Sequence, residues 1–201
     1  HASALRTTAA SAAALVVASL LLALGAAAPA PASAMLVGTE SNADLVNSNV
    51  TTAERAAILD RMRDAGVRVV RINMGWNEVA AGCGAESVDA LRSDSAACYD
   101  WRAFDEIVGF AQARGIAVLA SVSRAPQWLQ GSTNPMWLGD TSAQWGRTVQ
   151  HYAAFAQAAA HRYRSGSSIG RVRMWTVWNE PSSNTYLAPQ VTSAQRARVP
   201  A

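Results

Sequence analysis

After residue 34 the chain alternates between short apolar runs and amphipathic segments. The runs at positions 67–73 and 116–122 are rich in β-branched residues, which is typical of buried strands. Two further strands are expected at 35–39 and 171–178, and helical segments separate all four. An alternation of strands and helices predicts a parallel sheet whose connections are right-handed crossovers.

The helical segments carry local start and stop signals. Thr51 and Glu54 match a capping box, in which the hydroxyl and the carboxylate each satisfy a free amide at a helix start, and Gly66 supplies a left-handed stop. Asp100 is the expected N-cap of the second helix, and Gly115 its end. A third helix is expected to begin near Thr141, with these residues on its buried face: Trp145, Val149, Tyr152, Ala156 and Tyr163.

The placement of the loops favours a (β/α)8 barrel within the α/β class. The long stretches 74–99 and 124–140 follow strands, and in a TIM barrel the loops after the strands build the active site. No glycine-rich phosphate-binding pattern follows the first strand, which argues against a nucleotide-binding fold. A complete barrel needs about 250 residues. Residues 35–201 are therefore expected to be the N-terminal half of a TIM barrel, truncated to about the first four β/α units.

The N-terminal segment, residues 1–34, is not expected to belong to this fold. Positions 12–28 form an almost unbroken apolar stretch after Arg6, and the segment closes with Ala32-Ser33-Ala34. A charged start, an apolar middle and a small-x-small end are typical of a secretory signal peptide, so we predict a secreted, extracellular protein. A permanent membrane anchor is the alternative. The Ala-rich stretch is only weakly apolar and no basic cluster follows it, so no stable membrane insertion is expected after cleavage.

The composition indicates a globular domain without a polyanion-binding face. Half of the residues are hydrophobic and the formal net charge is +3. The 17 basic residues are all Arg, and they are scattered among acidic and apolar positions rather than clustered. Binding to nucleic acid is therefore not expected. The sequence implies no cofactor.

The two cysteines, Cys83 and Cys98, fall in one stretch rich in Gly, Ala, Ser and Asp. In an exported protein two such cysteines usually pair, and closing a loop of about 15 residues stabilises it by roughly 3 kcal/mol in the chain-entropy model. A metal site or a thiol nucleophile is the alternative, but no His lies nearby and no Cys-x-x-Cys occurs. We predict a structural disulfide and no metal site.

Glu180 is the residue with the clearest chemical signal. It follows the fourth expected strand, beside Trp178 and Asn179, and catalytic groups in barrels lie at the C-terminal ends of strands. A carboxylic acid in an apolar, Trp-lined site can hold a proton near neutral pH and deliver it to a glycosidic oxygen. Asn179 offers a donor and an acceptor to a sugar hydroxyl. The alternative is a surface Glu in a helix-starting loop, with Pro181 at the first helical position.

Other polar and aromatic residues carry weaker signals. Arg71 and Asn73 share a strand face with Val69, so Arg71 either points inward towards a carboxylate or forms a surface salt bridge. The Trp residues of the loops after the strands either stack on sugar rings or pack in the core: Trp76, Trp128 and Trp137.

Residues 172–181, Val-Arg-Met-Trp-Thr-Val-Trp-Asn-Glu-Pro, closely resemble the fourth-strand signature of the clan A retaining glycoside hydrolases, most of all the cellulase-type families 5 and 39. Residues 66–72 are similar to the second strand of family 5, and residues 125–128 to the Pro-x-Trp turn after the third strand. The resemblance covers most of residues 35–187. It therefore corresponds to the N-terminal half of the family's catalytic domain.

The resemblance implies hydrolysis of O-glycosidic bonds in a β-linked oligo- or polysaccharide by a retaining double displacement. Glu180 would be the acid/base, Asn179 would bind the hydroxyl next to the reacting carbon, and Arg71, Trp128 and Trp178 would complete the substrate-binding set. These families take the nucleophile from strand seven, and retention needs two carboxyl groups about 5 to 5.5 Å apart. The nucleophile is thus expected to be absent from this chain, which alone would be inactive. A non-catalytic truncated fragment or sugar-binding relic is the alternative.

We predict that export removes residues 1–34 and leaves Met35 as the mature N-terminus, because the small-x-small ending at Ala34 fits a signal-peptide cleavage site. Mass spectrometry of the secreted protein measures this terminus directly. A secreted protein that retains residues 1–34 would contradict the prediction.

Overall fold

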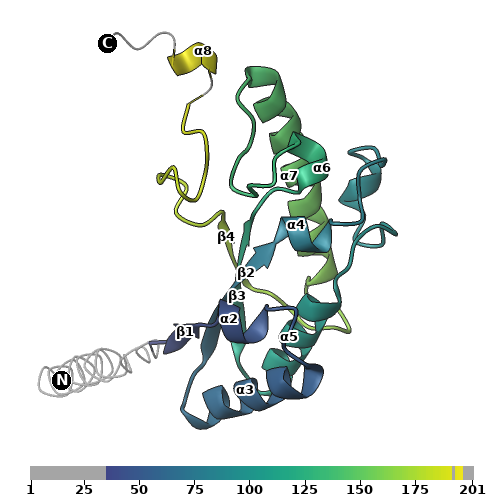
Figure 1. The fold of residues 1–201 in the computed structure, drawn as a ribbon. Helices are drawn as coiled ribbons and strands as arrows, with labels where there is room; N and C mark the ends of the chain where they lie inside the picture. Colours follow the sequence, from purple (N-terminus) through teal and green to yellow (C-terminus); the bar gives the residue numbers. More distant parts are fainter. Residues whose placement is uncertain (1–34, 192, 197–201) are drawn as a thin grey trace, which may run out of the picture. The chain divides into compact units, whose positions relative to one another are not determined.

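The computed structural model describes residues 35–191 and 193–196, and the signal peptide predicted at residues 1–34 lies outside them. The described residues form a four-stranded parallel sheet whose spatial order follows the sequence (Figure 1). Its strands are β1 (Gly38–Glu40), β2 (Val69–Gly75), β3 (Ala117–Ser123) and β4 (Met174–Val177). Parallel strands in chain order, joined through helices, correspond to the first four units of a (β/α)8 barrel, and the predicted fold class is confirmed.

The helices divide into long connecting helices and short helices within the loops. The long ones are α3 (Thr52–Asp64), α5 (Arg102–Ala113) and α7 (Ser142–Arg162). The short ones are α2 (Asn42–Leu45), α4 (Trp76–Val79), the 3-10 helix η1 (Ala90–Arg92), α6 (Gln127–Gln130) and α8 (Ser193–Arg196). Among the described residues, none of these helices combines the length and hydropathy that a membrane span requires.

The two faces of β2 differ in burial. On β2, Val70, Ile72 and Met74 are fully buried against the helices, whereas Arg71 and Asn73 between them are partly exposed. Successive side chains of a strand point to opposite faces, so Arg71 and Asn73 lie on the face that is the interior of a barrel. Of the two predicted arrangements, an inward-pointing Arg71 or a surface salt bridge, the structure has the inward-pointing one.

The helix ends follow the predicted signals closely. At the start of α3, the Thr51 amide donates to the Glu54 carboxylate at 2.8 Å, and the Glu54 amide donates to the Thr51 hydroxyl at 3.3 Å. Gly66, after α3, has a φ of 84°. The N-cap of α5 is Trp101 and not Asp100, although the Asp100 carboxylate accepts the Arg102 amide at 3.1 Å. The capping box and the left-handed stop are confirmed, and the start of α5 is one residue later than predicted.

The buried face of α7 follows the predicted one in part. The helix begins after Thr141 with a capping box to Gln144, but Val149, expected in the core, is 53% exposed. Tyr163 is fully buried, and Trp145 and Tyr152 pack against the core as predicted. The buried residues within the helix are Thr148, Ala154, Phe155, Ala158 and Ala159. Phe155 was not predicted, and its ring stacks on those of Trp76 and Trp101. In an Ala-rich helix the apolar pattern has little contrast, so the sequence does not distinguish Val149 from the positions that are buried.

A buried arginine ties the loop after β1 to α5. Arg55 is 6% exposed, and its guanidinium donates to the carbonyls of Leu45 at 2.8 Å and Asn47 at 3.2 Å. The same group forms an ion pair with Glu106 of α5 at 2.9 Å. A buried charge is tolerated only when it is paired and hydrogen-bonded, as Arg55 is. The loop after β1 is therefore held in one position relative to α5.

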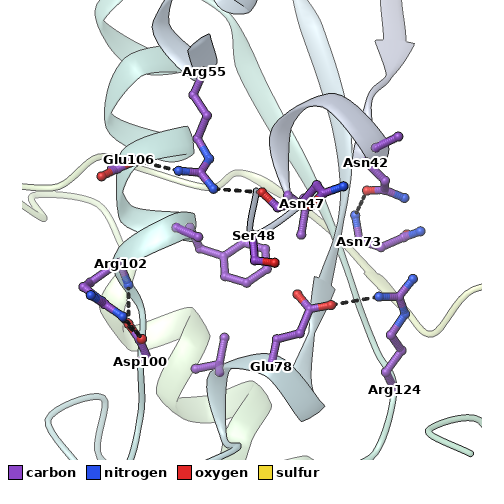
Figure 2. Close-up of a pocket in the computed structure, with 15 residues that line it drawn as sticks. Asn42, Asn47, Ser48, Arg55, Asn73, Glu78, Asp100, Arg102, Glu106 and Arg124 are labelled. Carbon is purple, nitrogen blue, oxygen red and sulfur yellow. Dashed lines mark hydrogen bonds and ion pairs between the residues drawn. The ribbon is translucent and has the colours of Figure 1, made fainter. Parts of the chain in front are cut away.

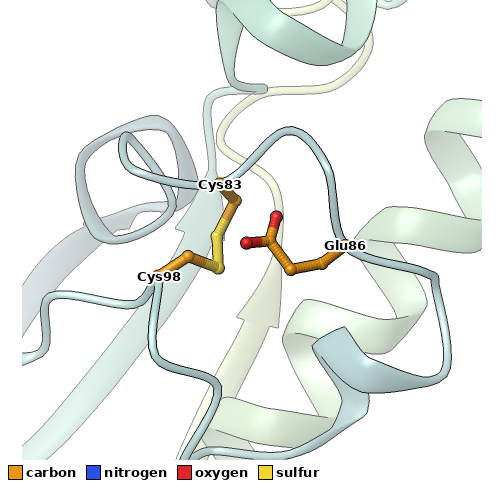
Figure 3. Close-up of side chains that lie close together, drawn as sticks. All are labelled: Cys83, Glu86 and Cys98. Carbon is orange, nitrogen blue, oxygen red and sulfur yellow. A yellow bond between two sulfur atoms is a disulfide. The ribbon is translucent and has the colours of Figure 1, made fainter.

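A disulfide closes the loop between α4 and α5. Cys83 and Cys98 are joined, with their Cα atoms 4.9 Å apart (Figure 3). The Glu86 carboxylate lies beside the two sulfurs, where it accepts the amides of Gly84 at 2.8 Å and Ala85 at 3.1 Å. Because both sulfurs are in the bond, this group has no thiolate to offer a metal ion.

We expect thiol titration of the denatured, non-reduced protein to find no free thiol. Replacing both Cys83 and Cys98 by Ser should lower the free energy of unfolding by about 2 to 4 kcal/mol, because the open loop gains conformational entropy in the unfolded chain. Urea unfolding of the double variant, compared with the oxidised and the reduced parent, measures this loss. Two titratable thiols before reduction would rule the disulfide out.

Candidate active site

Polar side chains are linked into a network at the C-terminal edge of the sheet. Arg71 of β2 forms an ion pair with Glu40 of β1 at 2.9 Å and donates to the Asn179 side-chain oxygen at 2.7 Å. Glu40 also accepts from the Asn42 side-chain amide at 3.1 Å. The Asn42 side-chain oxygen in turn accepts the Asn73 backbone amide at 2.6 Å. The network joins the ends of β1, β2 and β4.

Glu180 follows Asn179 directly and is exposed. Its carboxylate makes no hydrogen bond or ion pair within residues 35–191 and 193–196, so it is available to a ligand. The Glu180 carbonyl accepts the Ser183 amide at 3.0 Å, which closes a turn. Pro181 lies in this turn and not at the start of a helix, so the helix-starting interpretation is wrong.

Left-handed backbone conformations concentrate at the same edge. Among the described residues, the non-glycine positions with positive φ are Arg124 at 68°, Trp178 at 61° and Glu180 at 43°. All of them follow the last residues of β3 and β4. Such conformations cost about 1 to 3 kcal/mol each and occur mostly at functional sites, where the surroundings enforce them. Their position identifies the C-terminal edge as the candidate active site.

Trp178 anchors the chain just before the Asn-Glu pair. It is 5% exposed, its ring lies 5.8 Å from that of Tyr152, and its indole N–H donates to the Tyr186 carbonyl. Burial raises the pKa of Tyr152 to about 12, so the phenol keeps its proton and donates to the Val122 carbonyl at 2.8 Å. These contacts hold the end of β4 against α7. A sugar contact by Trp178 stays a prediction.

Two other tryptophan candidates, Trp128 and Trp76, have contacts that do not involve Glu180. Trp128 is on α6, where its indole N–H donates to the Ala80 carbonyl at 2.7 Å. It lines an open cleft of about 680 Å³ that Glu180 does not reach, and its role in binding substrate stays a prediction. Trp76 is 1% exposed and belongs to the core, so the hypothesis that it stacks on a sugar ring is wrong.

A larger groove, of about 830 Å³, opens between the loops that follow β1 and β2 (Figure 2). At one end Glu78 of α4 forms an ion pair with Arg124 at 2.9 Å. Burial raises the pKa of the Glu78 carboxyl, and the Arg124 guanidinium opposes this rise. The sequence gives no signal for Arg124, because only the left-handed turn after β3 directs its side chain to Glu78. No pattern of neighbouring residues in the sequence predicts the Glu78–Arg124 ion pair.

The sequence matches the family model described as cellulase, glycosyl hydrolase family 5, over residues 34–200. The chain belongs to family 5. The match includes all four strands and the Asn179-Glu180 pair, so the resemblance inferred from the fourth strand is confirmed. A search of curated proteins found no match to the sequence.

Solved structures similar to this family 5 chain include two family 39 enzymes. One comes from the gut symbiont Bacteroides cellulosilyticus WH2, with 19% identity and a TM-score of 0.45 over 72% of this chain and 24% of that chain. The other comes from Xanthomonas axonopodis pv. citri, with 19% identity and a TM-score of 0.43 over 77% of this chain and 29% of that chain. This chain thus corresponds to between 24% and 29% of the length of those enzymes.

The left-handed turn after β3 can be tested by paired substitutions of Arg124. Both Arg124→Gly and Arg124→Ala remove the guanidinium, so their difference isolates the backbone. We expect the Gly variant to be more stable than the Ala variant by about 1 kcal/mol, because only Gly adopts a positive φ without strain. Urea unfolding compares the two, and an Ala variant as stable as the Gly variant would show that the turn is not strained.

Proposed function

We propose that this chain is part of the catalytic domain of an enzyme that hydrolyses β-linked oligo- or polysaccharides by a retaining double displacement, with Glu180 as the acid/base. The observation that carries the proposal is the exposed, unpaired Glu180 carboxylate at the C-terminal edge of the sheet, beside Asn179. Membership of family 5 supports hydrolysis of glycosidic bonds. The strained conformations at this edge support the same location.

The network at the edge also determines what Asn179 presents to a substrate. A guanidinium carries donors and no acceptor, so the side-chain oxygen of Asn179 must face Arg71. The amide nitrogen is then directed away from Arg71 and can donate to a sugar hydroxyl. We propose that this hydroxyl is the one next to the reacting carbon, since a hydrogen bond there strengthens in the transition state.

Glu180 would act twice in the reaction. As an acid it protonates the glycosidic oxygen while the leaving sugar departs, and as a base it then takes a proton from the water that releases the enzyme-bound sugar. The other acidic residues near the edge are engaged, Glu40 with Arg71 and Glu78 with Arg124. The resemblance to families 5 and 39 implies a nucleophile on strand seven, so we assign it to a later strand of the barrel and not to residues 35–191.

We propose that the protein is exported. The apolar stretch and the small-x-small ending of residues 1–34 support export, and a disulfide such as Cys83–Cys98 is typical of oxidising compartments. A polysaccharide too large to enter a cell would then be accessible to the enzyme.

The acid/base role predicts a leaving-group-dependent effect of Glu180→Gln in the full-length protein. The substitution keeps the size and shape of the side chain but replaces the carboxyl group, so residue 180 no longer has a proton to transfer. We expect a loss of about 10² to 10⁴-fold in kcat/KM on substrates with poor leaving groups. The loss should be smaller on activated aryl glycosides, which depart without protonation. Steady-state kinetics on both substrate types measure the difference.

Glu86→Gln is the matched control, because it makes the same change in the loop closed by the disulfide, away from the strand ends. It should leave both rates unchanged. An equal loss on both substrate types would show that Glu180 acts only structurally, and an unchanged rate would remove it from the mechanism. Sugar binding without any turnover in the full-length protein would favour a sugar-binding relic.

A further inference from the structure

The chain turns out of the sheet at Trp178. The Trp178 amide still donates to the Val122 carbonyl of β3 at 2.8 Å, although β4 ends at Val177. A strand that continued regularly would direct its next carbonyl to a backbone amide of the neighbouring strand. The left-handed φ of 61° at Trp178 interrupts this pattern. Because Trp178 is only 5% exposed, its carbonyl needs a hydrogen-bond donor from the protein.

Ser121 of β3 supplies this donor. Its hydroxyl lies 2.9 Å from the Trp178 carbonyl oxygen, and the hydrogen bond is buried. Ser121 is paired with Asn73 of β2, so the two side chains share the face that is the interior of a barrel. Ser121 is fully buried there. A side chain of β3 thus does the work of a backbone amide and joins β3 to the first residue beyond β4.

The Ser121 hydrogen bond acts on a part of Trp178 that its other contacts do not hold. The amide is bonded to Val122, and the indole N–H donates to the Tyr186 carbonyl. These contacts hold the start of the residue and its ring. The hydroxyl of Ser121 holds the carbonyl and therefore the plane of the Trp178–Asn179 peptide. The orientation of this plane determines where the chain continues towards Glu180.

Asn179 and Glu180 differ in what holds their side chains. The Asn179 side-chain oxygen accepts from Arg71 at 2.7 Å, so it has an anchor of its own. The Glu180 carboxylate makes no hydrogen bond or ion pair within residues 35–191 and 193–196. The direction of the Glu180 side chain therefore depends on its backbone, which Ser121 anchors two residues earlier.

We propose that Ser121 is a positioning residue for the acid/base: its buried hydroxyl holds the left-handed turn at Trp178 and thereby directs the Glu180 carboxyl group to the glycosidic oxygen. This inference rests on the proposed function and adds to it a residue of a neighbouring strand that touches no substrate. A general acid must stay within hydrogen-bond reach of the oxygen that it protonates. Loss of the anchor should therefore slow the protonation step.

The test measures kcat/KM of Ser121→Ala in the full-length protein, on substrates with poor leaving groups and on activated aryl glycosides. We expect a loss of about 10- to 100-fold on the poor leaving groups, because the acid is misplaced. The loss on aryl glycosides should be smaller, since they depart without protonation. Each variant is assayed well below its own unfolding temperature, so that a lower stability does not enter the rates.

A double-mutant cycle shows whether Ser121 acts through Glu180. In the Glu180→Gln background no proton remains to be positioned, so adding Ser121→Ala should cost little more on the poor leaving groups. A role in packing alone would lower the rate by the same factor in both backgrounds. The cycle therefore separates a positioning residue from a structural one.

Ser121→Thr and Ser121→Val form a matched pair, because the two side chains have the same shape and differ in the hydroxyl. The Thr variant should keep most of the rate, and the Val variant should show the loss expected for Ser121→Ala. Val also fills the space that Ala leaves empty, so the pair decides the question if the Ala variant does not fold.

Thr148→Val is the control at another position. Thr148 of α7 is 2% exposed and its hydroxyl lies 3.0 Å from the Leu138 carbonyl, so the substitution removes a comparable buried hydrogen bond. It should lower the stability but leave the ratio of the rates on the two substrate types unchanged.

Three results would overturn the role of Ser121. These are parental rates in both the Ala and the Val variant, an equal loss on both substrate types, or a loss of the same factor with and without Glu180→Gln. Glu180→Gln alone judges the proposed function, since its own leaving-group dependence does not involve Ser121. A protein that shows this dependence but ignores the Ser121 variants would keep the proposed function and lose only this inference.

Discussion

The guanidinium of Arg71 connects the strand ends on which the proposed chemistry depends. Its planar fork bonds a carboxylate at the end of β1 and an amide oxygen after β4, although the chain separates Arg71 from Asn179 by 108 residues. Because Arg71 can only donate, it also determines which way the Asn179 amide points. A lysine has a single charged nitrogen and could not hold both partners in this geometry.

Arginine has three distinct tasks in this structure. Arg55 is buried and fixes a loop, Arg71 is half-buried and orients an amide, and Arg124 is held by its backbone at the rim of a groove. Arg55 and Arg71 each use several donors fixed in one plane, which match carboxylates and carbonyls more closely than an ammonium group does, whereas Arg124 bonds Glu78 through one nitrogen. The absence of Lys from the chain is therefore compatible with its architecture.

Features that depend on a few neighbouring residues could be predicted from the sequence. The α3 capping box, the stop at Gly66 and the position of Glu180 after a strand belong to this class. The groove and its Glu78–Arg124 pair could not be predicted, since two residues 46 apart meet only after β2 and β3 pair. The burial of Trp76 likewise depends on Phe155 of a later helix.

The order of the strands in space, which is their order in the chain, has a consequence for how the protein folds. Each β/α unit pairs with the unit made just before it, so most of the sheet can assemble progressively from the N-terminus. The Arg71–Asn179 bond is different, because β4 must first dock on β3. The Arg71–Asn179 part of the site therefore requires all four strands to be paired, whereas the groove requires only the first three.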